Sequence, residues 1–256
     1  MVYLGSSPIP VFNKKIIIWF LLLIKPFVNG IKHCIIITLL YKDNLMNLEN
    51  YLNNKPKSPE DIKMLDQLLE KIKSPEELLE YMGKNLEYGY VGKENNKIYS
   101  NSDPDFDINF DKEYFLQTPE QLLASGHGVC WDQVELEREW FSRKEYESKV
   151  YFLMFAKEEA NNLPTHTFLV YRSGDKFYWF ENSFGSQKGI HEYNDLESLI
   201  EGVKDRQFEY AKKERGATAD DFNDIKICEY ETPKFGCTTN EFINNILDKN
   251  PKKREI

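Results

Sequence analysis

The stretch GVCWDQVELEREWF, residues 128–141, decides the predicted fold. Cys130 follows a short glycine-containing turn and stands at the start of a segment with apolar residues at helical spacing, such as Val134 and Phe141. We therefore expect a helix that begins at Cys130. The thiolate is the nucleophilic form of cysteine, and a helix N-terminus stabilises negative charge. The position suits a nucleophile, although a lone cysteine is more often a buried core residue.

The turn before Cys130 contains Gly126 and Gly128, which leave space for the backbone of a substrate. Backbone N–H groups in this turn, those of Gly128 and Cys130 among them, can hold an oxyanion. The next residue, Trp131, has two interpretations: it lines the site, or it lies in the hydrophobic core.

Strands are expected after this helix, because segments rich in aromatic and β-branched residues follow it. Ser173-Gly174-Asp175 between two of them predicts a β-hairpin. The expected strands are 149–156, 165–172, 176–181 and 225–231.

Helix signals lie mainly before these strands. Ser58-Pro59-Glu60-Asp61 and Ser74-Pro75-Glu76-Glu77 place proline and acids in a first turn, and Thr118-Pro119-Glu120-Gln121 is a capping-box pattern. The polar, turn-rich residues 87–112 are expected to form a long loop or covering segment. Helices are expected at 58–72, from 74, from 118, at 194–203 and at 239–248. Helices followed by strands indicate an α+β domain with an antiparallel sheet.

A thiol nucleophile needs a base, and His166 opens one strand of the predicted hairpin. The partner strand ends in Glu181-Asn182, an acid and an amide that can orient a histidine. Cysteine, histidine and a third polar residue in this order follow the logic of a Cys-His-Asn or Cys-His-Asp site.

The register of the hairpin decides which residue is third. A two-residue turn at Gly174-Asp175 places Phe168 opposite Glu181, so that Glu181 shares a sheet face with His166. A three-residue turn places Asn182 opposite His166 instead. The Gly-Asp sequence favours Glu181, and Asn182 is the alternative.

Three motifs together resemble the transglutaminase-like superfamily: G-V-C-W-D at 128–132, T-H-T-F at 165–168 and Y-W-F-E-N at 178–182. The resemblance spans about residues 118–185. It implies a papain-like core with a Cys-His-Asp triad in that chain order, which makes Cys130 the nucleophile and His166 the base. Here Glu181 or Asn182 takes the place of the usual aspartate.

The resemblance implies acyl transfer on amide bonds through a thioester, as in peptidases, amidases, deamidases or protein-glutamine transferases. No cofactor is implied. The altered third residue motivates an alternative, a catalytically inactive binding module on the same fold. A further alternative is a zinc site of His127, Cys130 and His166, for which a fourth ligand is not evident.

The net charge and the cysteine content indicate which class of partner the protein binds and in which cellular compartment it lies. The chain has 256 residues, a net charge of -9 and a pI near 5.2, which argues against binding to nucleic acid. The resemblance instead implies a protein or peptide amide as the partner. Four cysteines without a CxxC pair indicate a reduced, cytoplasmic chain.

Residues 1–45 differ from the rest, with apolar runs at 16–24 and 35–40. Neither run reaches the roughly 20 apolar residues of a spanning helix, so we expect no membrane association unless residues 16–40 are native. The favoured interpretation is a mis-assigned start, with translation from Met46. A signal peptide, giving a secreted protein, and a weak membrane anchor are the alternatives. Residues 46–117 would then supply N-terminal helices and a covering loop, and residues 118–256 the catalytic domain.

Overall fold

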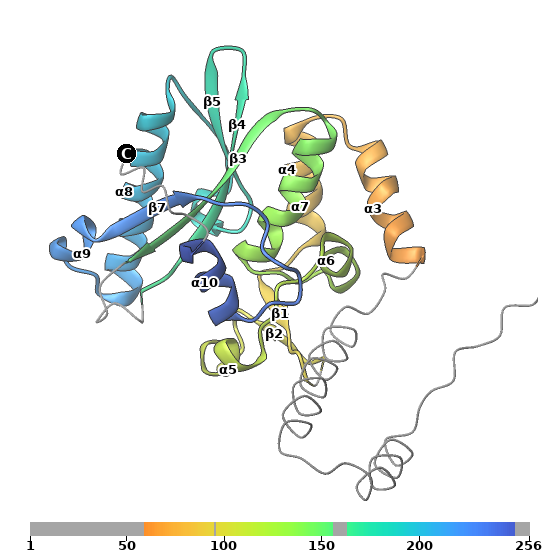
Figure 1. Cartoon of the computed structure of the whole chain (residues 1–256), viewed down its shortest axis with the longest axis horizontal. Helices are drawn as coiled ribbons and strands as arrows, with labels where there is room; N and C mark the ends of the chain where they lie inside the picture. Colours follow the sequence, from red (N-terminus) through yellow and green to blue (C-terminus); the bar gives the residue numbers. More distant parts are fainter. Residues whose placement is uncertain (1–58, 95, 156–162, 249–256) are drawn as a thin grey trace, which may run out of the picture. The chain divides into compact units, whose positions relative to one another are not determined.

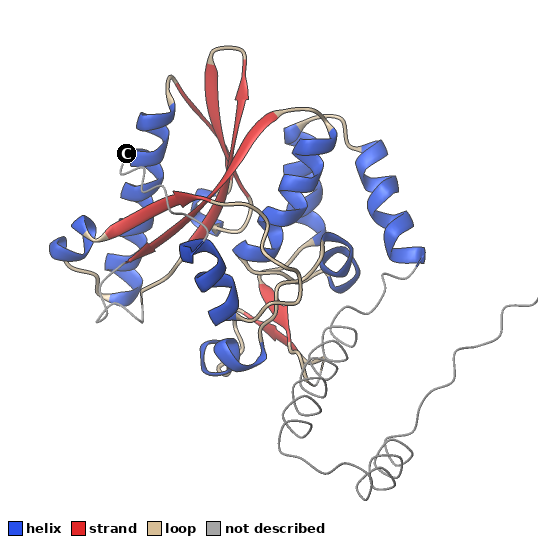
Figure 2. Cartoon of the chain, in the orientation of Figure 1, coloured by secondary structure: helices blue, strands red, loops and turns tan. Residues whose placement is uncertain are grey.

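The structure is a computed structural model that describes residues 59–94, 96–155 and 163–248 (Figure 1). These residues belong to one compact unit, Asn54–Ile256. They form an α+β fold with eight α-helices, a five-stranded antiparallel sheet and a separate two-stranded sheet (Figure 2). The prediction of an α+β fold with an antiparallel sheet is confirmed. Within these ranges no helix is both long and apolar enough to cross a membrane. The predictions for residues 1–45 lie outside the described residues.

Three of the N-terminal helices begin where the sequence predicts. They are α3 (Pro59–Lys71), α4 (Pro75–Asn85) and α6 (Pro119–Ser125). Helix α6 has a complete capping box, in which Thr118 and Gln121 satisfy each other's backbone N–H. Helix α6 contacts both α3 and the helix that begins at Cys130, α7 (Cys130–Arg143).

The predicted loop at 87–112 contains regular structure that the sequence pattern hid. It holds β1 (Gly89–Val91), β2 (Ile98–Ser100) and α5 (Phe106–Glu113). Polar turn residues dominate the segment, but its aromatic residues pack together: the rings of Tyr90 and Tyr99 stack at 4.8 Å between centroids. The burial of aromatic side chains therefore orders this segment, although its many polar residues predict a loop.

The main sheet has the strand order β6-β5-β4-β3-β7, with every pair antiparallel. The hairpin and the strand after residue 225 were predicted, whereas β6 was not. The strands are β3 (Glu147–Phe155), β4 (His166–Ser173), β5 (Lys176–Glu181), β6 (Gly189–Tyr193) and β7 (Ile225–Glu229).

The β4–β5 turn has the predicted register. Ser173 pairs with Lys176 and Leu169 with Phe180, as a two-residue turn requires. Gly174 takes a φ of 62°, the left-handed conformation that a type II′ turn needs at its first central position. Odd-numbered residues of β5 therefore share a sheet face with even-numbered residues of β4.

Each face of the sheet is covered by a helix (Figure 1). Helix α7 (Cys130–Arg143) covers one face, where Phe152, Leu169 and Phe180 are buried. Helix α8 (Leu196–Arg215) contacts β5 and β6 and covers the other, where Leu153, Val170 and Trp179 are buried. Helix α8 extends well beyond the predicted 194–203. The remaining helical elements are the 3-10 turn η2 (Gly185–Gln187), α9 (Ala219–Asn223) and α10 (Thr239–Asp248).

Candidate active site

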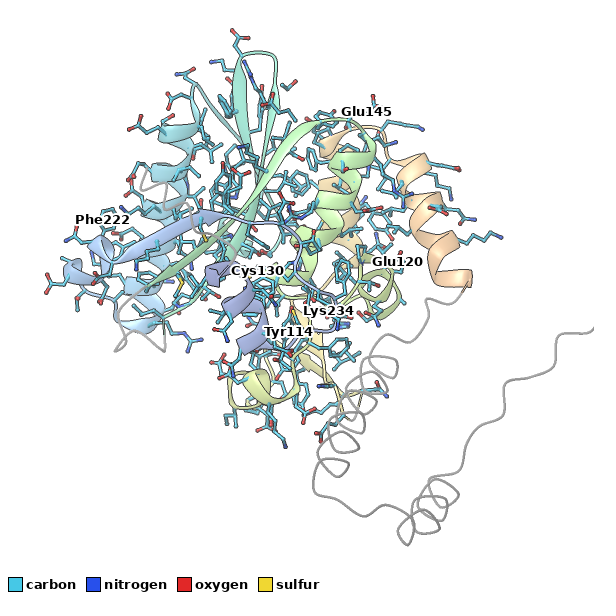
Figure 3. The ribbon with its side chains drawn as sticks, viewed as in Figure 1. Tyr114, Glu120, Cys130, Glu145, Phe222 and Lys234 are labelled. Carbon is cyan, nitrogen blue, oxygen red and sulfur yellow. The ribbon has the colours of Figure 1, made fainter. Side chains whose placement is uncertain are left out.

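Cys130 is the first residue of α7, as predicted, and only 5% of its surface is exposed (Figure 3). Asp132, in the first turn of the helix, binds the residue before Cys130 and a neighbouring segment of the chain. Its carboxylate accepts hydrogen bonds from the N–H of Val129 at 3.0 Å, the N–H of Gln117 at 2.9 Å and the hydroxyl of Tyr114 at 3.1 Å. Burial raises the pKa of Asp132 to about 7, although these donors oppose the shift. Asp132 thus holds the entry to the helix.

Gly128 has a structural role that differs from the predicted one. Its N–H already donates to the carbonyl of Glu87 at 3.2 Å, and its carbonyl accepts from the side-chain amide of Gln133 at 2.8 Å. A Cβ at this position would lie 2.4 Å from Leu122 Cδ1, so close packing requires glycine. The N–H of Gly128 is therefore not open to an oxyanion. Cys130, as the first helical residue, has no intrahelical acceptor for its own N–H.

Trp131 belongs to the hydrophobic core, which is the second of the two interpretations of this residue. Its side chain is 3% exposed and stacks on Phe242 with 4.0 Å between ring centroids. Tyr114 approaches the same ring edge-on at 5.4 Å. One residue along a helix turns the side chain by about 100°, which carries Trp131 away from the thiol of Cys130.

His166 and Glu181 form a buried pair. Nε2 of His166 lies 2.8 Å from Oε2 of Glu181, and the two residues are 4% and 2% exposed. Oε2 of Glu181 also accepts from the indole N–H of Trp179 at 3.2 Å. The other oxygen, Oε1, accepts from the hydroxyl of Ser183 at 2.9 Å and the N–H of Phe184 at 2.7 Å. The carboxylate is thus fully engaged and rigidly held.

The electrostatics of this pair favour an imidazolium beside a carboxylate. Burial acts to lower the pKa of His166, but the charge of Glu181 and hydrogen bonds to Cys130 and Glu181 raise it to about 10. Burial acts to raise the pKa of Glu181, but the charge of His166 and the other donors hold it below its ordinary value. Both groups are therefore charged at neutral pH.

Cys130 also interacts with His166 and raises its pKa. Because Glu181 engages Nε2, Nδ1 is the ring nitrogen left to face the sulfur. The sulfur at the helix N-terminus, the imidazole and the carboxylate thus interact in that order. This arrangement can support a thiolate–imidazolium pair.

Asn182, the alternative third residue, lies on the other side of the β5 chain. Its side-chain amide donates to Oε1 of Gln133 on α7 at 2.7 Å. Through Gln133, which also binds the carbonyl of Gly128, Asn182 ties the end of β5 to the turn before Cys130. The structure thus places Glu181 against His166 and gives Asn182 a supporting contact.

Two residues near the thiol had no signal in the sequence. Burial, followed by its interaction with Cys130, raises the pKa of Tyr88 well above the ordinary value. Glu137 lies two turns along α7 and is buried, and burial and the charge of Glu181 raise its pKa well above the ordinary value. Tyr88 reaches the site from the segment before β1, far from the motif. Glu137 has the appearance of a solvated helix residue in sequence.

The zinc interpretation has no support from His127. Its Nδ1 contacts the carbonyl of Ser125 at 2.8 Å and its Nε2 lies 3.4 Å from the carboxylate of Glu87. In the described part of the chain, no group of three or more potential ligands is arranged to hold a metal ion.

A comparison with protein-family models finds no match for this chain, and a comparison with curated proteins finds no similar sequence. The geometry around Cys130, His166 and Glu181 is therefore the basis for assigning a function.

Proposed function

We propose that this protein catalyses cysteine-dependent acyl transfer on amide bonds, with a transglutaminase-like Cys-His-Glu triad. The single observation that carries the proposal is the buried pair of His166 and Glu181, with 2.8 Å between Nε2 and Oε2, in which Cys130 contributes to the raised pKa of the imidazole. A histidine pinned between a thiol and a buried carboxylate is the arrangement that activates a nucleophile and then serves as an acid.

In the first half of the reaction, the Cys130 sulfur bonds to the carbonyl carbon of the substrate amide. The C=O π electrons move to oxygen, where the N–H of Cys130 can stabilise the charge. The C–N bond then breaks, and His166 gives its Nδ1 proton to the leaving amine. A thioester remains on Cys130.

In the second half, water or an amine attacks the thioester carbonyl. The now neutral His166 accepts the proton of this nucleophile, and the sulfur leaves as a thiolate. Hydrolysis gives an acid, whereas attack by an amine gives a new amide.

The role of Glu181 is to orient His166 and to stabilise its positive form. Its four donors keep the carboxylate ionised, so that it does not take the proton from His166. Glu181 is the carboxylate that raises the pKa of His166 most. Glutamate can replace the usual aspartate here because Glu181 reaches His166 from a diagonal position on the same sheet face.

The acidity of the chain indicates the substrate class. With a net charge of -9, the protein favours a protein or peptide amide in a neutral or basic context.

A binding module without catalysis is the second candidate. The low exposure of Cys130 and His166, 5% and 4%, favours it, because a substrate carbonyl has little access to the sulfur in this conformation. The two candidates differ in whether the thiol becomes acylated.

Acylation can be tested directly by incubating the full chain with a library of glutamine-containing peptides. After an acid quench, intact-protein mass spectrometry should find an acyl adduct on Cys130 that hydroxylamine removes, together with released ammonia or amine. Cys130→Ala should form none, while Cys228→Ala, a half-buried cysteine outside the triad, should form it normally. Equal adduct formation in Cys130→Ala would refute the proposal.

A further inference from the structure

Trp179 brings its indole N–H to the same oxygen of Glu181 that faces His166. The N–H donates to Oε2 at 3.2 Å, and Nε2 of His166 lies 2.8 Å from that atom. Residues 179 and 181 are two apart on β5, so their side chains share a sheet face, and the register places His166 on the same face. The contact between the acid and the base is thus shared with a third side chain.

The ring of Trp179 is held in place by three other elements. His191 of β6 is its cross-strand partner and stacks on it with 4.7 Å between ring centroids. Phe168 of β4 meets the ring edge-on at 6.4 Å, and the guanidinium of Arg206 on α8 lies 5.6 Å from its centroid. The side chain of Trp179 is fully buried. Close packing leaves such a ring little freedom to rotate, so its N–H has a fixed direction.

The two polar residues that contact this ring are anchored in turn. Nε2 of His191 lies 2.7 Å from the carbonyl of Gln187, and because a carbonyl can only accept, Nε2 carries the proton. Nη1 of Arg206 donates to the hydroxyl of Tyr193 at 2.6 Å and to the carbonyl of Gly202 at 3.0 Å. The position of the indole therefore depends on β6 and α8 as well as on β5.

The two oxygens of Glu181 are held in different ways. Oε1 accepts from Ser183 and Phe184, which follow Glu181 closely in the chain. Oε2 faces the base, and its other donor, Trp179, is fixed by the rest of the sheet. A carboxylate can accept about four hydrogen bonds, two at each oxygen, and Glu181 has all four. Rotation of the carboxylate would break the bond to the indole.

We propose that Trp179 is a positioning residue of the triad, whose indole N–H fixes the Glu181 oxygen that faces His166. It keeps Oε2 directed at Nε2 while the imidazole gives its other proton to the leaving amine and later takes a proton back. No bond to Trp179 forms or breaks, and it acts on the reaction through Glu181. This inference rests on the proposed acyl-transfer function and adds a residue to the group that supports it.

Trp179→Phe removes the indole N–H and tests this role. Without this donor Oε2 is free to turn from His166, and the charged form of Glu181 loses a hydrogen bond, so the imidazolium is less well supported. The thiolate of Cys130 then needs a higher pH to form. The acid limb of Cys130 alkylation by iodoacetamide should move to higher pH by about 1 unit, as expected for one hydrogen bond to a charged group.

Trp140→Phe is the matched control. Trp140 is also fully buried, but among the described residues its indole N–H has no hydrogen-bond partner. This variant loses the same ring volume from the core. It should be less stable than wild type in urea denaturation and still keep the wild-type pH profile of alkylation.

A second variant removes the donor with hardly any change in packing. Benzothienylalanine at position 179 has the shape of tryptophan, with sulfur in place of the indole N–H. It should shift the alkylation profile to higher pH as Trp179→Phe does, and it provides the result if Trp179→Phe does not fold.

A profile of the benzothienyl protein that coincides with that of wild type, or that moves to lower pH, would overturn the inference. An equal shift in Trp140→Phe would overturn it as well. Failure of the proposed function has a different signature: wild-type Cys130 would then react below about pH 8 no faster than Cys228.

Discussion

Nε2 of His166 lies 2.8 Å from Oε2 of Glu181, while the next residue, Asn182, binds Gln133 on α7. Adjacent residues at the end of β5 thus serve opposite sides of the sheet, as strand geometry dictates. The two-residue turn at Gly174 sets this parity. A shift of one residue in the pairing of β4 with β5 would place Asn182 instead of Glu181 beside His166.

Removing the charge of Glu181 should impair the site without removing its hydrogen-bonding oxygen. In Glu181→Gln, the positive form of His166 loses its counter-charge, so the pKa of His166 should fall. Acylation of Cys130 by p-nitrophenyl acetate should slow by about 100-fold, the lower range of what acid–base catalysis supplies. A stopped-flow measurement of p-nitrophenolate release provides the rate. Glu192→Gln, which removes a carboxylate charge next to Tyr178 and Lys176 on the exposed edge, is the control and should match wild type. Equal rates for both variants would contradict the role of Glu181.

Asn182 should matter for stability more than for the chemistry. Asn182→Ala leaves the buried Oε1 of Gln133 without its donor, which should lower the free energy of unfolding by about 1–3 kcal/mol. Urea denaturation provides this value. The pH profile of Cys130 alkylation should stay that of wild type, because Asn182 contacts Gln133 and not the imidazole. A lost or shifted alkylation profile with unchanged stability would assign Asn182 to the triad instead.

The raised pKa of His166 predicts how stability depends on pH. The pKa is raised from 6.5 to about 10, so the folded state binds this proton more tightly than the unfolded state. The contribution to stability is complete below about pH 6.5 and is lost as the pH rises toward about 10. The test uses Cys130→Ser as its background, because this variant has no thiol that titrates. Glu181 still raises the pKa of His166 in that background.

The measurement compares Cys130→Ser with Cys130→Ser/His166→Gln by urea denaturation. The gap in free energy of unfolding between the two proteins should narrow from about pH 7 to about pH 10. A gap that is constant over this range would mean that His166 is not held as an imidazolium.

Trp131 should behave as a core residue. Trp131→Ala removes the ring that stacks on Phe242 and should lower the free energy of unfolding by about 3–5 kcal/mol. Trp131→Phe should cost less, since it keeps an aromatic ring at this position. Thermal unfolding and alkylation of Cys130 can be measured on both. A Trp131→Phe protein with normal stability and a strongly altered alkylation rate would restore the interpretation that Trp131 lines the site.

The central part of the fold could be predicted because its signals are local. The helix at Cys130, the capping box at Thr118 and the hairpin around Gly174 each depend on a few neighbouring residues. The contact between His166 and Glu181 followed from the parity of one turn. Such features need no knowledge of distant parts of the chain.

The remaining features depend on contacts between distant segments. Strands β1 and β2 have only three residues each, within a largely polar segment, and they are ordered by aromatic packing around Tyr90. The segment that contains Tyr88 lies beside the turn before Cys130 because the backbone of Glu87 pairs with His127. The hydrogen bond from the N–H of Gly128 to the carbonyl of Glu87 also joins these two distant segments. A local pattern contains no information about such pairings, so the sequence did not predict the environment of the thiol.

The measurement that tests the central claim most directly is alkylation by iodoacetamide as a function of pH, with the modified residue located by mass spectrometry. Wild type, His166→Ala and Glu192→Gln would be compared, the last as a control on the exposed edge. We predict fast, selective labelling of Cys130 well below about pH 8, the region where an ordinary thiol is mostly protonated. This labelling should persist in Glu192→Gln and disappear in His166→Ala. Slow labelling shared among Cys130, Cys228 and Cys237, and indifferent to His166, would contradict a thiolate activated by this histidine.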